Sequence, residues 1–353
     1  MLTFIRRRVL LSVPVIVGVS VVVFSIVHLL PGDPVLAILS GANATPEQER
    51  ELRAQLRLDD PLLVQYGRFV ARAVVGDFGR SIFTRRPVIQ EIAEQLPSTL
   101  ELAATAIVIA SVVGLALGLL AAVWHDTWID RAAMLVALGG VSMPSFWLGL
   151  LLIFVFSLQL GWLPATGQGG FSRLLLPAAT IGLNYSAVIA RLVRSSLLEV
   201  LGNGYIGTAR AKGLSEWGVT LKHALGNALI PVTTIIGVQL GNLLAGTIIV
   251  ETVFSRRGMG RLAVTAVLDK DYPLIQGVVL VSALGYVLTN LDVCCAAGNL
   301  RSSAPSSWPS SRSPRCSRRR WRRTTRSRSG RARRCRRRRW PIRSARTSMA
   351  ATS

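Results

Sequence analysis

The segment at 204–231 gathers charged and aromatic side chains among strong helix formers, and its sequence is GYIGTARAKGLSEWGVTLKHALGNALIP. We call residues 204–231 the central segment. Its charged and aromatic side chains include those of Arg210, Lys212, Glu216 and Trp217. Charges of both signs beside a tryptophan suit non-covalent contact with a partner. A helix that lies on the membrane surface without a partner is the alternative interpretation.

Two residues predict how this segment folds. Gly213 separates two helical pieces, because a residue without a Cβ adopts a tight bend at the lowest cost. Ser215 is the predicted N-cap of the second piece, since its side-chain oxygen can accept a hydrogen bond from a free backbone N–H group.

Residues that commonly perform catalysis or bind metals are few and scattered. His28, His125 and His223 show no ligand spacing, and no Gly-Lys-Ser or Gly-Lys-Thr follows a glycine-rich turn, so the chain lacks a P-loop for ATP. The cysteines match no zinc pattern, and they are Cys294, Cys295, Cys316 and Cys335. We therefore assign no catalytic, metal-binding or cofactor-binding residue.

Six apolar runs supply the elements that must hold the central segment. A membrane-spanning helix needs about 20 mostly apolar residues, and such runs lie at 9–30, 99–124, 132–160, 175–193, 228–250 and 274–291. Buried helices of a soluble core rarely recur six times at this length. The sequence therefore predicts an all-α polytopic membrane protein with six transmembrane helices. Pro144 lies inside the third run, which is long enough to be tilted, kinked or broken there.

Loop charges predict the orientation. Three arginines at 6–8 precede the first run; a cleavable signal peptide is the alternative, but the run is too long and no A-x-A-like site follows. The positive-inside rule places this N-terminus in the cytoplasm, and six spans bring the C-terminus and the loop 194–227 to the same side. The loop 251–273 disagrees with the rule, because it carries four basic and three acidic residues on the outer side.

The segment 31–96 predicts a small helical extracytoplasmic cap, too short to bury a core of its own. Thr45-Pro46-Glu47-Gln48 is a capping box with proline at the first helical position. Asp60-Pro61 likewise predicts the start of a helix at a proline. The helix after Pro61 has an apolar stripe of Leu62, Leu63, Tyr66, Phe69, Val70 and Ala73. A third helix is expected at 87–95. The cap either supports the bundle or forms a gate or docking surface.

Polar residues inside the apolar runs are candidates for a translocation path. Ionisable side chains are nearly absent from the runs, which argues against proton coupling. Gln239 and Asn242 lie close together in a glycine-rich run, and Asn184 lies in the fourth run. We predict path contacts for these three residues, with interhelical hydrogen bonds as the alternative. Small residues at Gly114-x-x-x-Gly118 predict close helix packing.

The net charge of +23 comes mainly from the C-terminal end. Residues 301–353 hold 19 arginines and no Lys, Asp or Glu, which leaves 22 basic and 18 acidic residues, a charge of +4, for the rest of the chain. We therefore predict a transmembrane domain at 1–300 and a disordered tail that cannot form a core. The tail is interpreted as GC-rich DNA read out of frame, or alternatively as a cytoplasmic arm for anionic lipid or nucleic acid.

Several stretches together resemble one family. TARAKGLSEW and KHALGNALIP are similar to the cytoplasmic coupling region of binding-protein-dependent ABC importer permeases of the dipeptide, oligopeptide and nickel branch. Further matching stretches, in chain order, are HLLPGDPV at 28–35, GDFGRSI at 76–82, LPSTLELA at 96–103, GWLPATG at 161–167, ARLVRSSLLEVL at 190–201 and VETVF at 250–254. The resemblance covers about residues 1–292.

The resemblance implies a type I ABC importer fold with six transmembrane helices and a role in importing di- or oligopeptides across the cytoplasmic membrane of a bacterium. It implies pairing with a second, homologous permease subunit and delivery by an extracytoplasmic peptide-binding protein. Two ABC ATPase subunits, which bind the ATP, would dock on a coupling helix at 208–217, so this chain would need no cofactor. The coupling residues carried over are Ala209, Arg210, Lys212, Gly213, Leu214, Ser215, Glu216 and Trp217.

Some positions depart from the family pattern. Gly207 stands where other ABC importers have the first glutamate of the motif, and Gly226 stands where they have its later proline. Arg256 and Arg257 replace a more apolar turn after VETVF; we interpret them as solvated, with an acidic binding protein or a peptide carboxylate as alternative contacts. We expect contact with membrane lipid and none with nucleic acid. A secondary transporter or channel is the alternative function, and a membrane-tethered nucleic-acid binder rests on the tail alone.

Overall fold

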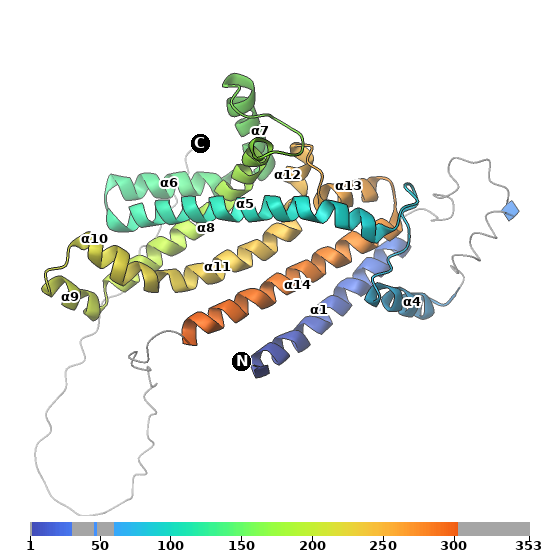
Figure 1. Cartoon of the computed structure of the whole chain (residues 1–353), viewed down its shortest axis with the longest axis horizontal. Coiled ribbons are helices and arrows are strands. Elements are labelled where there is room, and N and C mark those ends of the chain that lie inside the picture. The colour runs from blue at the N-terminus through green and yellow to red at the C-terminus, as the bar shows by residue number, and fades with distance from the viewer. Residues whose placement is uncertain (1, 30–45, 48–59, 303–353) are drawn as a thin grey trace, which may run out of the picture. The chain divides into compact units, whose positions relative to one another are not determined.

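A computed structural model describes residues 2–29, 46–47 and 60–302, in which helices are joined by turns and loops (Figure 1). The described part contains no strand, only an isolated antiparallel bridge between Arg80 and Pro87. The longer helices are α1 (Leu2–Leu29), α5 (Val88–Val123), α6 (Trp128–Ser142), α8 (Phe171–Leu201), α11 (Leu225–Gly246) and α14 (Tyr272–Ser302). The shorter ones are α4 (Leu62–Val74), α7 (Ser145–Leu152), α9 (Gly204–Ala211), α10 (Glu216–Gly218), α12 (Ile248–Val253) and α13 (Met259–Leu268), with π-helical turns η1 (Ile153–Gln159) and η2 (Val219–Ala224).

Long apolar helices account for most of the predicted spans. Four stretches are long and apolar enough to cross a membrane, namely Val88–Val123, Phe171–Leu201, Glu216–Leu243 and Tyr272–Thr289. The bent pair of α6 with α7 and η1 makes a fifth if it counts as one span. The first predicted run lies in α1, where the apolar stretch found among the described residues is the shorter Leu10–Ser25. By length and composition the described part thus holds four or five spans, where the sequence predicts six.

The third predicted run is broken at Pro144. The chain bends by 108° between α6 and α7, and Met143 is extended (φ −90°, ψ 131°), because the residue before a proline is disfavoured in the helical region. The side-chain amide of Asn184 on α8 donates to the carbonyl oxygens of Gly140 at 2.9 Å and of Met143 at 3.4 Å. Asn184 therefore satisfies two carbonyls at the break.

Helices α5 and α8 approach each other closely through glycines. A Cβ on Gly114 would lie 2.7 Å from the Cβ of Ile189, and one on Gly118 would lie 2.6 Å from the carbonyl oxygen of Ala190. Because lipid supplies no hydrophobic force between helices, close backbone approach is what holds such a pair. The predicted packing face Gly114-x-x-x-Gly118 is confirmed.

An ion pair fixes α6 to the C-terminal half of α8. Arg194 donates two hydrogen bonds to the buried carboxylate of Asp130, from Nε to Oδ1 at 2.7 Å and from Nη2 to Oδ2 at 2.6 Å. The backbone N–H of Asp126 adds a third at 3.1 Å. The predicted loop 194–227 was wrong at its start, since α8 continues to Leu201 and carries Arg194 as a packing residue.

Part of the predicted cap at 31–96 lies outside the described residues, namely 31–45 and 48–59, including half of its capping box at 45–48. Helix α4 does begin after Pro61, and Tyr66 packs on Phe24 of α1 with ring centroids 5.5 Å apart. Its stripe is only partly covered, because Leu62 and Leu63 are exposed. The separate helix predicted at 87–95 was wrong: α5 starts at Val88 and passes through Pro97 without interruption.

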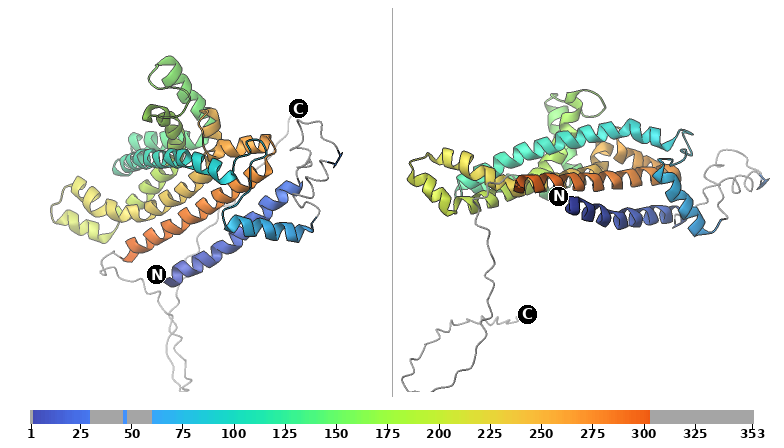
Figure 2. Two further views of the ribbon diagram at one scale, coloured as in Figure 1. Left: turned by 45° about the vertical axis from the view of Figure 1, so that its right-hand side comes forward. Right: turned by 60° about the horizontal axis from the view of Figure 1, so that its bottom comes forward.

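The described part has two ends, which carry different short helices. Figure 1 places α9 and α10 at one end of α5 and α13 at the other. Figure 2 shows α14 running beside α1 in both views, and the two helices are in contact. The central segment and the loop after VETVF are therefore held apart along the length of the spans.

We expect replacement of Gly118 by alanine to destabilise the protein by about 1–3 kcal/mol, because the added methyl group must push α5 away from α8. Thermal unfolding of the purified protein in detergent measures the change. Gly139→Ala on α6 is the matched control, since nothing lies within 4 Å of a Cβ there and alanine is the better helix former. Equal melting temperatures for Gly118→Ala and the original protein would contradict the packing.

Candidate functional site

The central segment folds as two short helical pieces around Gly213. Helix α9 ends at Ala211, and the backbone N–H of Gly213 donates to the carbonyl oxygen of Arg210 at 2.9 Å. Gly213 has φ +80°, a left-handed conformation that glycine adopts without strain. The predicted division at Gly213 is confirmed, and the range 208–217 of the predicted coupling helix comprises the end of α9, this bend and the start of α10.

Buried side chains anchor α9 to the ends of the spans. Ile206 and Ala209 are buried in an apolar cluster with Leu197 of α8 and Ala122 of α5. The other members of the cluster come from η2 and α11, and they are Val219, Ala224 and Ala228. A displacement of α9 must therefore move the ends of α5, α8 and α11 with it, since close-packed cores transmit rather than absorb strain.

Polar contacts fix the shape of the bend. Arg210 donates to both carboxylate oxygens of Glu216, from Nε at 2.8 Å and from Nη2 at 3.1 Å. The Oγ of Ser215 accepts a hydrogen bond from the N–H of Gly218 at 3.3 Å, which confirms the predicted N-cap. An exposed pair such as Arg210–Glu216 contributes only about 0.2–1 kcal/mol to stability, so it orients the bend more than it stabilises the protein.

Large apolar side chains remain uncovered beside these charges. The indole of Trp217 is 54% exposed, and its ring meets that of Trp124, at the end of α5, edge-on at 6.2 Å. Its uncovered apolar neighbours along the chain are Tyr205, Leu214 and Leu221. We call the exposed residues Tyr205, Arg210, Lys212, Leu214, Glu216, Trp217 and Leu221 the docking surface. Exposed aromatic and apolar groups interspersed with charge are typical of surfaces that bind another protein.

A second cluster of polar contacts lies at the opposite end and was missed by sequence reasoning. The buried carboxylate of Glu251 on α12 accepts hydrogen bonds from the hydroxyls of Thr99 at 2.8 Å and Thr247 at 2.9 Å. It also accepts from the backbone N–H groups of Gly260 at 2.8 Å and Arg261 at 3.1 Å, at the start of α13. We call this arrangement the Glu251 latch. It joins α5, α12 and α13 at one point.

The sequence offered one indication of the latch, because Glu251 in VETVF is an acidic residue directly after the apolar run 228–250. Gly258 completes it, because a Cβ there would overlap the carboxyl group of Glu251. The same arrangement recurs before α14, where the buried carboxylate of Asp271 accepts from Ser81 and from the N–H of Ile82 at 3.1 Å. Both acids accept from backbone N–H groups at the start of α13 or in the loop before α5.

The two arginines after VETVF have different environments. Arg256 is 2% exposed, and its Nη2 donates to Glu101 on α5 at 2.6 Å, so the interpretation of Arg256 as a solvated loop residue was wrong. Burial follows because the chain turns at Phe254 and Ser255 and directs this side chain onto α5. Arg257 is exposed, as predicted.

The structure places the three predicted path residues on two helices that pack together. Gln239 is buried and Asn242 half-buried on α11, while the amide of Asn184 on α8 is engaged at the break after Gly140. Helices α8 and α11 are in contact. A role for these three residues in translocation stays a prediction.

Comparison with known proteins assigns this fold. Residues 114–299 match the family model for the inner membrane component of binding-protein-dependent transport systems, and residues 1–103 match the model for its N-terminal part. The chain belongs to this family. It is therefore a permease subunit of an ABC importer and a component of a bacterial inner membrane. Family membership excludes the alternative of a secondary transporter or channel, and it identifies a transport subunit rather than a catalytic enzyme.

Individual relatives agree with this assignment. The chain is 47% identical over 301 residues to the glutathione transport system permease protein GsiC of Escherichia coli strain K12, covering 85% of this chain and 98% of that protein. It is 46% identical over 301 residues, with the same coverage, to GsiC of Shigella flexneri serotype 5b. The resemblance to the dipeptide, oligopeptide and nickel branch is confirmed.

A solved structure supports the fold alone. A chain of the MetNI methionine ABC transporter in inward-facing conformations aligns with a TM-score of 0.51 at 19% identity, covering 60% of this chain and 96% of that one. The predicted fold class, an all-α membrane protein of the type I ABC importer kind, is confirmed.

The Glu251 latch makes a direct prediction. Replacing Glu251 by glutamine turns one acceptor oxygen into an NH₂ group that faces hydrogen-bond donors, so we expect a loss of about 1–3 kcal/mol of stability. Thermal unfolding in detergent measures the loss, with Asp269→Asn at an exposed neighbouring acid as the control. Equal stability of both variants would show that the latch is not a stabilising contact.

Proposed function

We propose that this permease subunit imports small peptides, with glutathione-like tripeptides among its substrates. The support is the 47% identity to permeases of a glutathione transport system over nearly their whole length. The scarcity of acidic and basic side chains inside the apolar runs fits a path for solutes that is driven from outside the chain rather than by protons.

The docking surface is the proposed contact for two ABC ATPase subunits, which bind and hydrolyse the ATP. The exposure of Trp217 beside Arg210 and Glu216 carries this proposal, because uncovered aromatic and charged groups call for a partner. The coupling role of the carried-over residues, from Ala209 to Trp217, belongs to the same proposal. A second permease subunit would complete the path, and an extracytoplasmic peptide-binding protein would deliver the substrate.

In this proposal coupling is mechanical. Closure of the ATPases would displace α9, and the buried side chains of Ile206 and Ala209 would pass the movement to the ends of α5, α8 and α11. A ligand can shift such an equilibrium only as far as its affinities for the two states differ. The ATP state of the partners would therefore set which state of the spans is favoured.

We propose an orientation that agrees with the loop charges. With the ATPases in the cytoplasm, α9, α10 and both termini would lie on the cytoplasmic side, while α4, α13 and the Glu251 latch would lie outside. The acyl chains of membrane lipid would cover the exposed apolar side chains of the spans. All of the tail at 301–353 except its first two residues, which end α14, lies outside the described residues, and we propose that the tail takes no part in transport.

Co-purification tests the proposed partners. Tagged protein expressed with its neighbouring transport genes is expected to bring down two ATPase subunits and a second permease, and reconstituted vesicles are expected to import glutathione only when ATP is supplied. The variant Trp217→Glu on the docking surface is expected to bring down much less of the ATPase subunits. Import that survives without ATP would contradict the proposal.

Gly213 tests the coupling. Valine at this position costs about 1–2 kcal/mol in the left-handed conformation, whereas asparagine tolerates it; a Cβ meets nothing within 4 Å, so strain alone separates the two variants. We expect Gly213→Val to lower the amount of solute imported per ATP hydrolysed, and Gly213→Asn to retain it.

Glu216→Lys belongs to the same experiment, because it places a second positive charge against Arg210. Glu199→Lys, at an exposed position on α8, is its control. Normal coupling in both Gly213→Val and Glu216→Lys would count against the assignment of the segment.

A further inference from the structure

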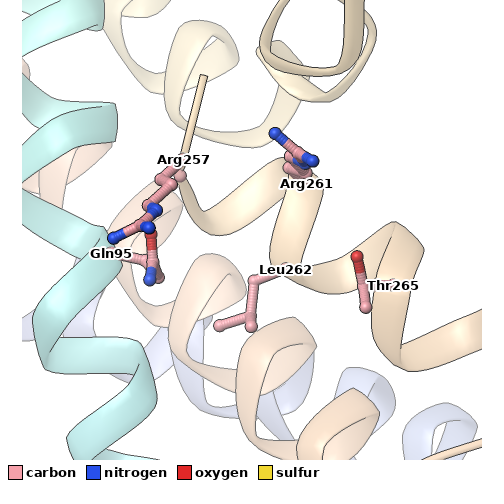
Figure 3. A pocket seen from close by; sticks show the side chains of 6 residues that line it. Gln95, Arg257, Arg261, Leu262 and Thr265 are labelled. Atoms are coloured by element: carbon pink, nitrogen blue, oxygen red, sulfur yellow. The ribbon is translucent and has the colours of Figure 1, made fainter. Parts of the chain in front are cut away.

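A small polar pocket lies at the end of the described structure that is opposite the docking surface. It has a volume of about 260 Å³ and is lined by Gln95, Arg257, Gly258, Arg261, Leu262 and Thr265. Figure 3 shows the side chains of Arg257 and Gln95 close together beside α5, with Arg261, Leu262 and Thr265 following along α13. Two guanidinium groups, an amide and a hydroxyl thus share one concave site.

The positive charge of this pocket is only partly offset within the described part of the chain, where the carboxylate of Glu94 feels the charge of Arg257 but forms its ion pair with Arg86. The nearby carboxylates already have partners, because Glu101 accepts from Arg256 and Glu94 accepts from Arg86. The carboxylate of Glu251 is buried and bonded to four donors. Among the described residues no ion pair is formed by Arg257 or Arg261.

The backbone that carries the arginines is held in place. The Glu251 latch binds the N–H of Arg261 itself, and Gly258 packs against the carboxyl group of the same glutamate. On the other side, Leu262 packs against an apolar cluster that includes Ile92 and Ile275. A preorganised backbone lowers the cost of ordering a site when a ligand binds.

Resting on the proposed function, we propose that this pocket binds the free carboxylate of a peptide substrate as it enters the permease. Guanidinium groups bind carboxylates through paired N–H donors, and the side chains of Gln95 and Thr265 can bond the adjoining peptide group. Complete pockets for small molecules usually measure about 300–1,000 Å³. A site of 260 Å³ therefore suits the end of a peptide better than a whole one.

The charge selectivity of the pocket can be measured without transport. In a variant whose native cysteines are replaced by serine, Thr265→Cys is exposed to thiosulfonate reagents that carry either a sulfonate or a trimethylammonium group. We expect the anionic reagent to react about tenfold faster than the cationic one, because the two arginines concentrate anions.

Two comparisons control this measurement. Arg257→Gln with Arg261→Gln is expected to abolish the preference. Leu268→Cys, exposed on the same helix outside the pocket, is expected to show nearly equal rates. The same ratio at both cysteines would overturn the proposal.

A transport assay then tests whether the pocket recognises the carboxylate of a peptide. With the complete transporter and its binding protein in vesicles, trialanine and trialanine amide are compared, since they differ only in the carboxylate. Arg257→Gln with Arg261→Gln is expected to reduce the preference for the acid over the amide about tenfold. Arg80→Gln, an exposed arginine outside the pocket, is expected to keep that preference.

The other outcomes are equally informative. An equal loss for acid and amide, with weaker association of the binding protein, would overturn the proposal in favour of a protein contact. A loss that appears only in vesicles containing anionic lipid would overturn it in favour of a lipid headgroup. If the original transporter imports neither peptide, the proposed function fails, while the reagent rates still decide whether the pocket selects anions.

Discussion

Backbone N–H and C=O groups that are buried away from water must find partners inside the protein, and this constraint shapes several interruptions of the helices. At three breaks among the described residues, a side chain from a neighbouring element supplies the missing partner. Asn184 covers the carbonyls freed before Pro144, Glu251 binds the open N–H groups of α13, and Asp271 accepts from the chain before α5. Each of these three side chains also ties separate elements together.

The two ends of the spans meet opposite requirements. At the end with α9, several charged and large apolar side chains are exposed, and two buried residues hold the segment to the spans. At the end with α13, the buried carboxylates of Glu251 and Asp271 are bonded inside the protein, and the two arginines of the pocket form no ion pair among the described residues. The first end is suited to a surface that engages a large partner. The second is suited to a small ligand on a fixed frame.

Much of this could be predicted from the sequence, because periodic and local signals carry it. The apolar runs predicted the helices, Pro144 predicted the break, and Ser215 predicted the cap next to Gly213. What the sequence could not supply were contacts between distant residues. Nothing local shows that Arg256 reaches Glu101 or that Thr99 reaches Glu251, since these partners are more than a hundred residues apart. Helix ends were also hard to predict, because α5 and α8 extend as regular helices beyond their apolar stretches.

The docking surface comes from one uninterrupted stretch of chain, bounded by the end of α8 and the start of α11, whereas the pocket combines α5 with α13. Under the proposed function, separate parts of the gene therefore encode the residues that bind the ATPases and the residues that bind the solute. The stretch 204–224 could be exchanged as a unit between related permeases, provided that the side chains of Ile206 and Ala209 pack against the same apolar cluster at the ends of the spans. Partner specificity and solute specificity would then be free to evolve independently.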